Sequence, residues 1–367
     1  MELVRKNIRQ VQAYVAGKPI EETKRELGLT NVIKLASNEN PIGASPRAIT
    51  AMRKALQCVN RYPDSQSFYL KAKLAKKLGV KPDNLVLGNG SDELIDVVIK
   101  TFVEDNENIV TSRQTFVEYE IIAQVNNKKV VTVPLKNLAF DLRAMAAAVT
   151  PKTKLVFIAN PNNPTGTYVS RGEFERFLKK LPARAIVVLD EAYDTFIDVD
   201  DYPCGIDYIK SGRVIVLKTM SKGYGLAGVR IGYCIAPARF TPFLERARQP
   251  FNVNLIAQAA ALGALDDAAF LSKTRRITLA GKKYLYRELA AMGVAYIPSV
   301  TNFILIDAGR DCVEVFRRLL ALGVIVRDMK QYRLDSFLRV SIGTPAENKK
   351  FISAFKKVLS SFQGARS

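Results

Sequence analysis

Short runs of apolar residues recur between residues 84 and 236, and most are separated by segments in which apolar positions follow helical spacing. Two such segments are SDELIDVVIKTFV (91–103) and SRGEFERFLKKL (170–181). Strands that alternate with helices are typical of an α/β core with a buried, mostly parallel sheet. Seven runs rich in β-branched and aliphatic residues are therefore predicted to be strands: 84–88, 108–112, 129–135, 154–160, 185–191, 213–219 and 230–236.

The pattern changes near residue 254. An apolar helical segment (254–265) and a basic helical stretch lead into shorter elements, which predict a second, smaller α+β domain. The first 45 residues are expected to form an N-terminal arm that belongs in part to this smaller domain. We thus expect a large α/β domain over 46–262 and a small domain over 263–367.

Composition restricts the class of protein. Of the 367 residues, 48% are hydrophobic and 25% are charged, as in soluble globular chains. No run approaches the roughly 20 apolar residues of a membrane-spanning helix. The first ten residues, MELVRKNIRQ, lack the apolar core of a signal peptide. We therefore expect a cytoplasmic protein with no membrane partner.

The chain contains no histidine, and its four cysteines lie far apart in the sequence. The absence of histidine excludes Ser–His and Cys–His nucleophilic pairs and His-ligated metals. The cysteine spacing indicates neither a zinc site nor a disulfide framework, and we expect no metal. Any proton transfer must use Lys, Asp, Glu, Tyr or a cofactor.

The formal net charge is +20, which suits either nucleic acid or anionic small molecules. The basic residues are spread along the chain, and clusters such as 71–77 follow helical spacing, as on solvated helix faces. We therefore expect anionic metabolites as ligands and no nucleic acid. The alternative, a nucleic-acid-binding protein, would show weak and steeply salt-dependent DNA binding.

Polar residues follow several of the predicted strands. Ligands of α/β sheets bind outside the carboxyl ends of strands, where Asp190 is placed to face a cationic group. In GNGSDE (88–93), the amides of Ser91 and Asp92 are placed to bind a phosphate at a helix N-terminus. NPNNPTG (160–166) offers the amide of Asn163. Each stretch alone is also compatible with an ordinary turn or helix cap.

The segment KTMSKGYGLAGVR (218–230) places a lysine in a small, apolar context. Lys222 in a partly dry site can lose its proton and attack a carbonyl. Lys218 is the competing lysine, but the S-K-G context favours Lys222. These four loops, each just after a predicted strand, would meet at one ligand. That ligand needs a phosphate, a ring cation and an aldehyde, and pyridoxal 5'-phosphate has all three.

NPNNPTG, DEAY (190–193) and SKGYGLAGVR (221–230), in this order, resemble fold-type I, pyridoxal-phosphate-dependent aminotransferases. KLASNENPIGASP (34–46), NRYPD (60–64), GNGSDELI (88–95) and LRVSIGT (338–344) resemble the histidinol-phosphate aminotransferase family in particular. The resemblance runs from residue 13 to about residue 345. It implies a fold-type I transferase with a large, mostly parallel seven-stranded sheet domain and a smaller α+β domain.

The resemblance also implies roles for individual residues. Lys222 would form the aldimine with the cofactor and carry the proton between the substrate Cα and the cofactor C4′. Asp190 would pair with the pyridinium nitrogen, and Tyr193 and Asn163 would bind the ring 3′-oxygen. Phe116 takes the ring-stacking position, where the family often has tyrosine. The phosphate would be held by Ser91, Asp92, Thr219, Ser221 and Arg230.

Four further residues are implied, one at the cofactor and three at the substrate. Tyr62 would reach the cofactor phosphate of a neighbouring subunit, which implies a homodimer with shared active sites. Arg339 would bind a substrate carboxylate or phosphate, and Arg327 would supply a second anion contact. Tyr14 matches the tyrosine of the family's N-terminal arm, although this arm lacks the usual prolines. Surface salt bridges and packing aromatics are the alternative interpretations of these residues.

The implied reaction is a ping-pong transamination in histidine biosynthesis. L-Histidinol phosphate and 2-oxoglutarate would be interconverted with imidazole-acetol phosphate and L-glutamate. Two alternatives of the same fold remain open. One is an aromatic amino acid aminotransferase. The other is a threonine-phosphate decarboxylase, which would release carbon dioxide and need no keto acid.

Overall fold

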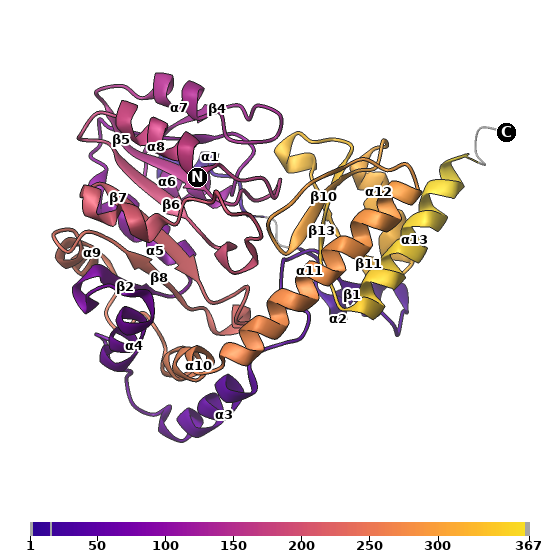
Figure 1. The fold of residues 1–367 in the computed structure, drawn as a ribbon, viewed down its shortest axis with the longest axis horizontal. Helices are drawn as coiled ribbons and strands as arrows, with labels where there is room; N and C mark the ends of the chain where they lie inside the picture. Colours follow the sequence, from indigo (N-terminus) through magenta and orange to yellow (C-terminus); the bar gives the residue numbers. More distant parts are fainter. Residues whose placement is uncertain (1–2, 15–16, 364–367) are drawn as a thin grey trace.

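The computed structural model describes residues 3–14 and 17–363. The chain forms a larger part around a seven-stranded sheet and a smaller part around a four-stranded sheet (Figure 1). The long helix α11 (Ala268–Ala291) runs from the larger part to the smaller one (Figure 1). No single helix in the described ranges has the length and apolarity of a membrane span, and α10 with α11 passes that test only as a pair bent by 82°.

All seven predicted strands are confirmed, and they form one sheet in the order β2-β8-β7-β6-β5-β3-β4. Only β8 runs antiparallel to its neighbours in this sheet, so the other six strands end at the same edge. The strands are β2 (Leu85–Gly88), β3 (Asn108–Ser112), β4 (Lys129–Val133), β5 (Thr153–Ala159), β6 (Ile186–Asp190), β7 (Val214–Thr219) and β8 (Gly232–Ile235).

Helices pack around this sheet (Figure 1). The two predicted helices are confirmed as α5 and α8, and α8 begins with a capping box between Ser170 and Glu173. The helices of the larger part are α3 (Pro46–Ala55), α4 (Phe68–Leu78), α5 (Ser91–Phe102), α6 (Glu118–Val125), α7 (Leu142–Ala148), α8 (Arg171–Lys180), α9 (Thr241–Ala247) and α10 (Leu255–Leu265).

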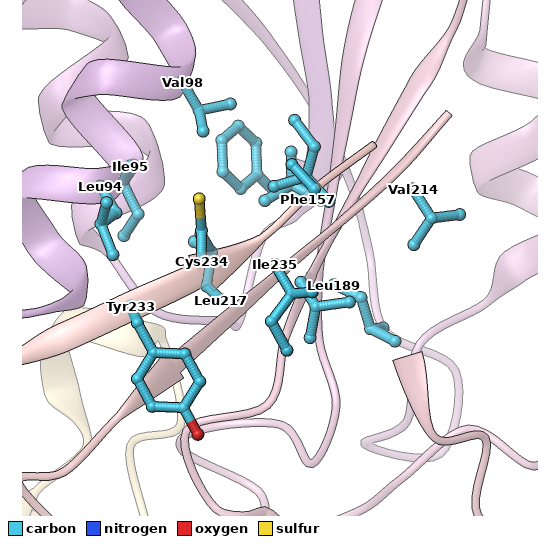
Figure 2. Close-up of a cluster of buried hydrophobic side chains, with 14 of the residues drawn as sticks. Leu94, Ile95, Val98, Phe157, Leu189, Val214, Leu217, Tyr233, Cys234 and Ile235 are labelled. Atoms are coloured by element: carbon cyan, nitrogen blue, oxygen red, sulfur yellow. The ribbon is translucent and has the colours of Figure 1, made fainter. Parts of the chain in front are cut away.

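The core of the larger part lies between α5 and the sheet. Figure 2 shows Leu94, Ile95 and Val98 of α5 beside Phe157 and Cys234 of the strands, and all five are buried. Burial of this apolar surface stabilises the fold by about 25 cal/mol for each Å² removed from water. The central strands are therefore held rigidly, and so are the loops that leave their carboxyl ends.

The smaller part has a sheet in the order β12-β13-β10-β9. The parallel pair β1–β11 joins the N-terminal segment to it, as expected for the arm. The domain limits at residues 45 and 262 stay a prediction. The elements are α1 (Lys6–Gln10), α2 (Ile20–Leu27), β1 (Ile33–Lys34), β9 (Tyr296–Ile297), β10 (Phe303–Asp307), α12 (Cys312–Ala321), β11 (Val324–Ile325), β12 (Arg327–Asp328), β13 (Phe337–Ser341) and α13 (Pro345–Gln363).

Candidate active site

A cavity of about 260 Å³ lies at the carboxyl edge of the seven-stranded sheet. The loops after β2, β3, β5, β6 and β7 line it, and Arg230, which precedes the antiparallel β8, reaches the same edge. Residues of the N-terminal segment and of the smaller sheet complete its wall. Of the fourteen predicted site residues, all but Tyr62 line this cavity: Tyr14, Ser91, Asp92, Phe116, Asn163, Asp190, Tyr193, Thr219, Ser221, Lys222, Arg230, Arg327 and Arg339.

Lys222 follows β7 and is half-buried in the cavity wall. Its Nζ donates a hydrogen bond of 3.2 Å to the carbonyl oxygen of Ser37 and lies 6.0 Å from the ring centroid of Tyr193. Burial, helped by the positive charge of Arg339, lowers the pKa of Lys222 to about 8. About a tenth of this amine is therefore neutral, and so nucleophilic, at pH 7, far more than for an ordinary lysine.

The competing lysine, Lys218, is placed differently. It is buried, and its Nζ pairs with Glu191 at 2.6 Å and with Asp194. Burial alone would lower the pKa of Lys218, but the two carboxylates outweigh it and hold that pKa well above its usual value. Lys218 is thus a permanent cation that ties the turn after β6 to the end of β7, and the sequence preference for Lys222 agrees with this geometry.

Asp190 ends β6 and is 5% exposed. Its Oδ1 accepts a hydrogen bond of 3.1 Å from the amide of Ala192, and its Oδ2 accepts one of 2.6 Å from the hydroxyl of Tyr119. Burial raises the pKa of Asp190 to about 6, and both hydrogen bonds oppose that rise. The carboxylate is therefore ionised at neutral pH and suited to a ring cation.

Sequence reasoning missed Tyr119. Its ring is buried, lies 4.9 Å from that of Phe157, and meets the ring of Phe116 edge-on at 5.6 Å. The only signal for it was its place three residues after Phe116, in the segment QTFVEY (114–119). It forms part of the cavity wall beneath the predicted stacking residue.

The N-terminus of α5 forms the predicted phosphate end. Gly90 has a φ of +84°, which strains any residue with a side chain, and a Cβ at this position would lie 2.4 Å from Nη2 of Arg230 and displace that guanidinium. Nη2 of Arg230 pairs with Asp92 at 2.9 Å, and the hydroxyl of Thr219 accepts the amide of Ser221 at 3.1 Å. Helix amides, two hydroxyls and a guanidinium thus meet at one end of the cavity, as anion binding requires.

Arg327 and Arg339 occupy the other end of the cavity, and each is 8% exposed. Nη2 of Arg339 donates to the carbonyl of Ala36 at 2.6 Å, and Nη1 donates to Oδ1 of Asn163. Nε of Arg339 is buried without a hydrogen-bond partner in the part of the chain that the structure describes. Nη2 of Arg327 donates to Oε1 of Gln331 at 3.2 Å. Two guanidinium groups in one cavity wall, one of them with an unused donor, are suited to an anionic ligand.

Residues 36–39 line one side of the cavity. They lie in the segment KLASNENPIGASP, but none of them was predicted as a site residue. Asn38 is the most constrained of the four, with a φ of +54° and a side chain that bonds the hydroxyl of Tyr193 at 3.0 Å. Asparagine is one of the few residues that adopt this conformation readily. Tyr14, at the end of the described part of the N-terminal arm, faces the cavity and is 52% exposed.

Tyr62 is the one predicted site residue outside the cavity. Its side chain is 82% exposed and stacks on Phe251 with ring centroids 4.7 Å apart. Within a single chain it contributes nothing to the site.

The donor set fits pyridoxal phosphate. The α5 terminus suits its phosphate, Asp190 its ring cation, Lys222 its aldehyde and Phe116 the face of its ring. Arg327 and Arg339 line the same cavity and are not required by these four groups, so their charges remain for a second anion. Within the described ranges, no group of three or more Cys, Asp or Glu side chains is placed to hold a metal ion.

Comparison with known proteins supports this assignment. The family "Aminotransferase class I and II" matches residues 30–355. The histidinol-phosphate aminotransferase of Moorella thermoacetica is 49% identical over 97% of this chain and 92% of that protein. Histidinol-phosphate aminotransferase 2 of Carboxydothermus hydrogenoformans is 46% identical over 97% and 99%. The solved structure of histidinol-phosphate aminotransferase from Sinorhizobium meliloti in complex with pyridoxal-5'-phosphate has a TM-score of 0.90 at 29% identity, over 99% of both chains.

Proposed function

The chain belongs to the class I and II aminotransferase family, and we propose that it is a histidinol-phosphate aminotransferase of histidine biosynthesis. The reaction moves an amino group between L-histidinol phosphate and 2-oxoglutarate, with imidazole-acetol phosphate and L-glutamate as the other pair. The observation that carries this proposal is the cavity itself. It places a lysine of lowered pKa between an ionised aspartate and two buried arginines.

The cofactor is pyridoxal 5'-phosphate, which supplies an electrophilic carbon and a ring that withdraws electrons from the substrate Cα when it is bound. Its phosphate would be held by the amides of Ser91 and Asp92 and by Thr219, Ser221 and Arg230, which line the cavity. Phe116 would supply the stacking face for the ring. Asp190 would pair with the ring nitrogen, and its negative charge would keep that nitrogen protonated.

Lys222 is the nucleophile and the proton carrier. Its lowered pKa leaves part of the amine free to attack a carbonyl near neutral pH. The free amine would then take the proton from the substrate Cα and carry it to the cofactor C4′. No histidine is needed, because one lysine moves each of these protons.

The two arginines recognise the anionic ends of both substrates. Histidinol phosphate carries a phosphate and 2-oxoglutarate carries two carboxylates, so one pair of guanidinium groups serves each in turn. The net charge of +20 favours the approach of both anions. Tyr14 covers this end of the cavity from the N-terminal arm.

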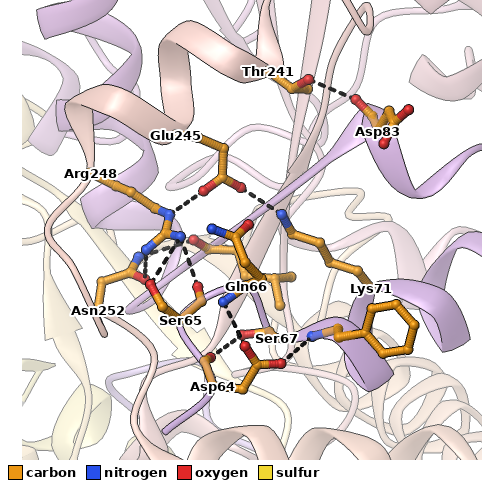
Figure 3. Close-up of polar contacts among 12 residues, drawn as sticks. Asp64, Ser65, Gln66, Ser67, Lys71, Asp83, Thr241, Glu245, Arg248 and Asn252 are labelled. Carbon is orange, nitrogen blue, oxygen red and sulfur yellow. Dashed lines mark hydrogen bonds and ion pairs between the residues drawn. The ribbon is translucent and has the colours of Figure 1, made fainter. Parts of the chain in front are cut away.

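We also propose a homodimer in which Tyr62 serves the site of the partner. The segment that carries Tyr62 is fixed although its side chain is exposed. Asp64 accepts the amides of Gln66 and Phe68, and Arg248 donates to the carbonyl of Ser65 at 2.7 Å. Figure 3 shows Asp64, Ser65, Gln66 and Arg248 within this set of polar contacts. A side chain held rigidly in solvent is suited to insertion into a second chain.

Exposed apolar surface supports this dimer. Large apolar side chains along residues 56–69, which we call the 56–69 patch, are more than half exposed: Leu56, Val59, Tyr62, Phe68 and Tyr69. Concentrations of this kind mark protein interfaces. The expected partners are thus a second copy and small anionic substrates. The cytoplasmic location and the absence of nucleic-acid and membrane partners remain expectations from the sequence.

Steady-state kinetics test the proposed activity. Initial rates with histidinol phosphate and 2-oxoglutarate varied together should give parallel double-reciprocal lines, because the amino group waits on the enzyme between substrates. A higher kcat/KM with phenylalanine as donor would replace the proposed substrate by aromatic amino acids. Carbon dioxide released from phosphothreonine without a keto acid would identify a decarboxylase instead.

A further inference from the structure

Asn38 uses every hydrogen-bonding group that it has. Its backbone amide donates to the hydroxyl oxygen of Ser341 at 2.8 Å, and its backbone carbonyl accepts from Nδ2 of Asn302 at 3.0 Å. Its side-chain Oδ1 accepts from the hydroxyl of Ser341 at 3.0 Å, and its Nδ2 donates to the hydroxyl oxygen of Tyr193 at 3.0 Å. Asn38 is 1% exposed, so water does not replace these bonds.

The bonds to Ser341 fix which way the Asn38 amide points. The hydroxyl oxygen of Ser341 accepts the backbone N–H of Asn38, and its own proton is donated to Oδ1 of Asn38. The NH₂ group faces Tyr193, where Nδ2 donates to the phenol oxygen. A phenol oxygen that accepts this N–H keeps its single proton available for a different acceptor.

Tyr193 holds that proton. Burial raises the pKa of Tyr193 to about 12, so the phenol is neutral over the working range of the enzyme. The ring of Tyr193 is fixed by edge-on packing against Phe303 at 5.1 Å. Tyr193 and Asn163 both line the cavity, and both are proposed to bind the 3′-oxygen of the cofactor.

We infer that Asn38 is a positioning residue that makes Tyr193 a hydrogen-bond donor to the cofactor oxygen. The inference rests on the proposed function and adds a residue to it. Asn38 does not touch the reacting atoms, and it acts through the direction of one O–H bond. Because Ser341 lies two residues after Arg339 on β13, the same contact also connects the substrate-binding strand to Tyr193.

The test removes the amide without straining the backbone. Asn38→Gly is the suitable variant, because glycine adopts a φ of +54° freely whereas alanine does not. The readout is the pH midpoint of the visible absorbance change of the cofactor-loaded enzyme. A donor to a ring oxygen stabilises the anionic form of that oxygen, so loss of the donor raises the midpoint.

Asn38→Gly should raise this midpoint by about 0.5 to 1 pH unit, the worth of one ordinary hydrogen bond. Tyr193→Phe should raise it at least as far. In the Tyr193→Phe background, Asn38→Gly should cause no further rise, because its effect passes through the missing hydroxyl. A purely structural role would instead shift both backgrounds equally.

Either an unchanged midpoint in Asn38→Gly or an equal rise in both backgrounds contradicts the inference and leaves the proposed function intact. If Asn38→Gly does not fold, Ser341→Ala decides, since it frees the Asn38 amide to rotate. A rise smaller than that of Tyr193→Phe supports the inference, and an unchanged midpoint contradicts it. A wild-type protein that takes up no cofactor overturns the proposed function and this inference together.

Discussion

Arg327 and Arg339 lie directly opposite each other on the neighbouring strands β12 and β13, and both are almost fully buried in one cavity wall. Like charges placed opposite each other in a sheet repel. An anion between them would turn this repulsion into attraction. We therefore propose that the pair binds the phosphate or carboxylate of the substrates.

Replacement of Arg339 by glutamine removes one charge of that pair. We expect KM for both histidinol phosphate and 2-oxoglutarate to rise by roughly 10- to 100-fold, since a charge-assisted hydrogen bond contributes about 1.5 to 3 kcal/mol. Steady-state kinetics with each substrate in turn measure this, with the exposed Arg317→Gln as the matched control. A rise for one substrate alone would show that the two anions use different arginines.

Lys222→Ala removes the proposed nucleophile and proton carrier. Turnover should fall by at least about 10²- to 10⁴-fold, the usual contribution of a positioned acid–base group. Circular dichroism should remain that of the wild type. The control is Lys210→Ala, which removes an exposed lysine of the same part of the chain. Turnover at the wild-type rate in Lys222→Ala would refute the assignment.

Lys222 also carries a stability cost that depends on pH. Its pKa is about 8 in the folded protein and about 10.5 in the unfolded chain, so between these values the unfolded state binds the extra proton. The stability of the wild type relative to Lys222→Met should therefore rise as the pH increases across this window. Below pH 8 the wild type carries the full destabilisation caused by burying the charged lysine. Thermal unfolding of both cofactor-free proteins at pH 7 and pH 10.5 checks this. Lys222→Met should unfold at the higher temperature at pH 7, and an equal difference at both pH values would contradict the burial argument.

Tyr119→Phe removes one hydrogen bond to the Asp190 carboxylate. That bond opposes the rise of the Asp190 pKa caused by burial, so its loss should move this pKa above 6. A protonated Asp190 no longer attracts the ring cation, so acidification should weaken cofactor binding. In Tyr119→Phe this loss of affinity should begin at a higher pH than in the wild type. Cofactor titrations between pH 5 and 8 measure the shift. An identical pH dependence would show that Tyr119 is only a packing residue.

Val59→Asp places a charge in the 56–69 patch. The proposed dimer should dissociate, which sedimentation velocity detects, and activity should fall with it because Tyr62 leaves the partner's site. Leu322→Asp, at an exposed apolar position of the smaller part, is the control and should remain dimeric. A wild-type chain that sediments as a monomer would rule out the shared site.

The sequence could predict most of this architecture because the relevant signals are local. Each strand of the large sheet is a short β-branched run followed by a polar loop, so the loops that contain Asp190, Asn163 and Lys222 could be recognised from a few adjacent residues. Sheet geometry then brings these loops together without further information, because parallel strands end at the same edge.

Residues that act through distant partners could not be found in this way. Tyr119 is 71 positions from Asp190, and Asn38 is 155 positions from Tyr193 and 303 from Ser341. No local pattern distinguishes these side chains from packing residues, because their importance depends on contacts made only in the folded chain. Tyr62 could be named only through the family resemblance, because its proposed site lies in a second chain.

The visible spectrum of the purified, cofactor-loaded protein tests the central claim most directly. We predict a yellow protein whose absorbance is bleached much faster by histidinol phosphate than by phenylalanine at equal concentration. Addition of 2-oxoglutarate should then restore the colour. A protein that stays colourless after pyridoxal phosphate is added, or a yellow one that histidinol phosphate does not bleach, would contradict the account.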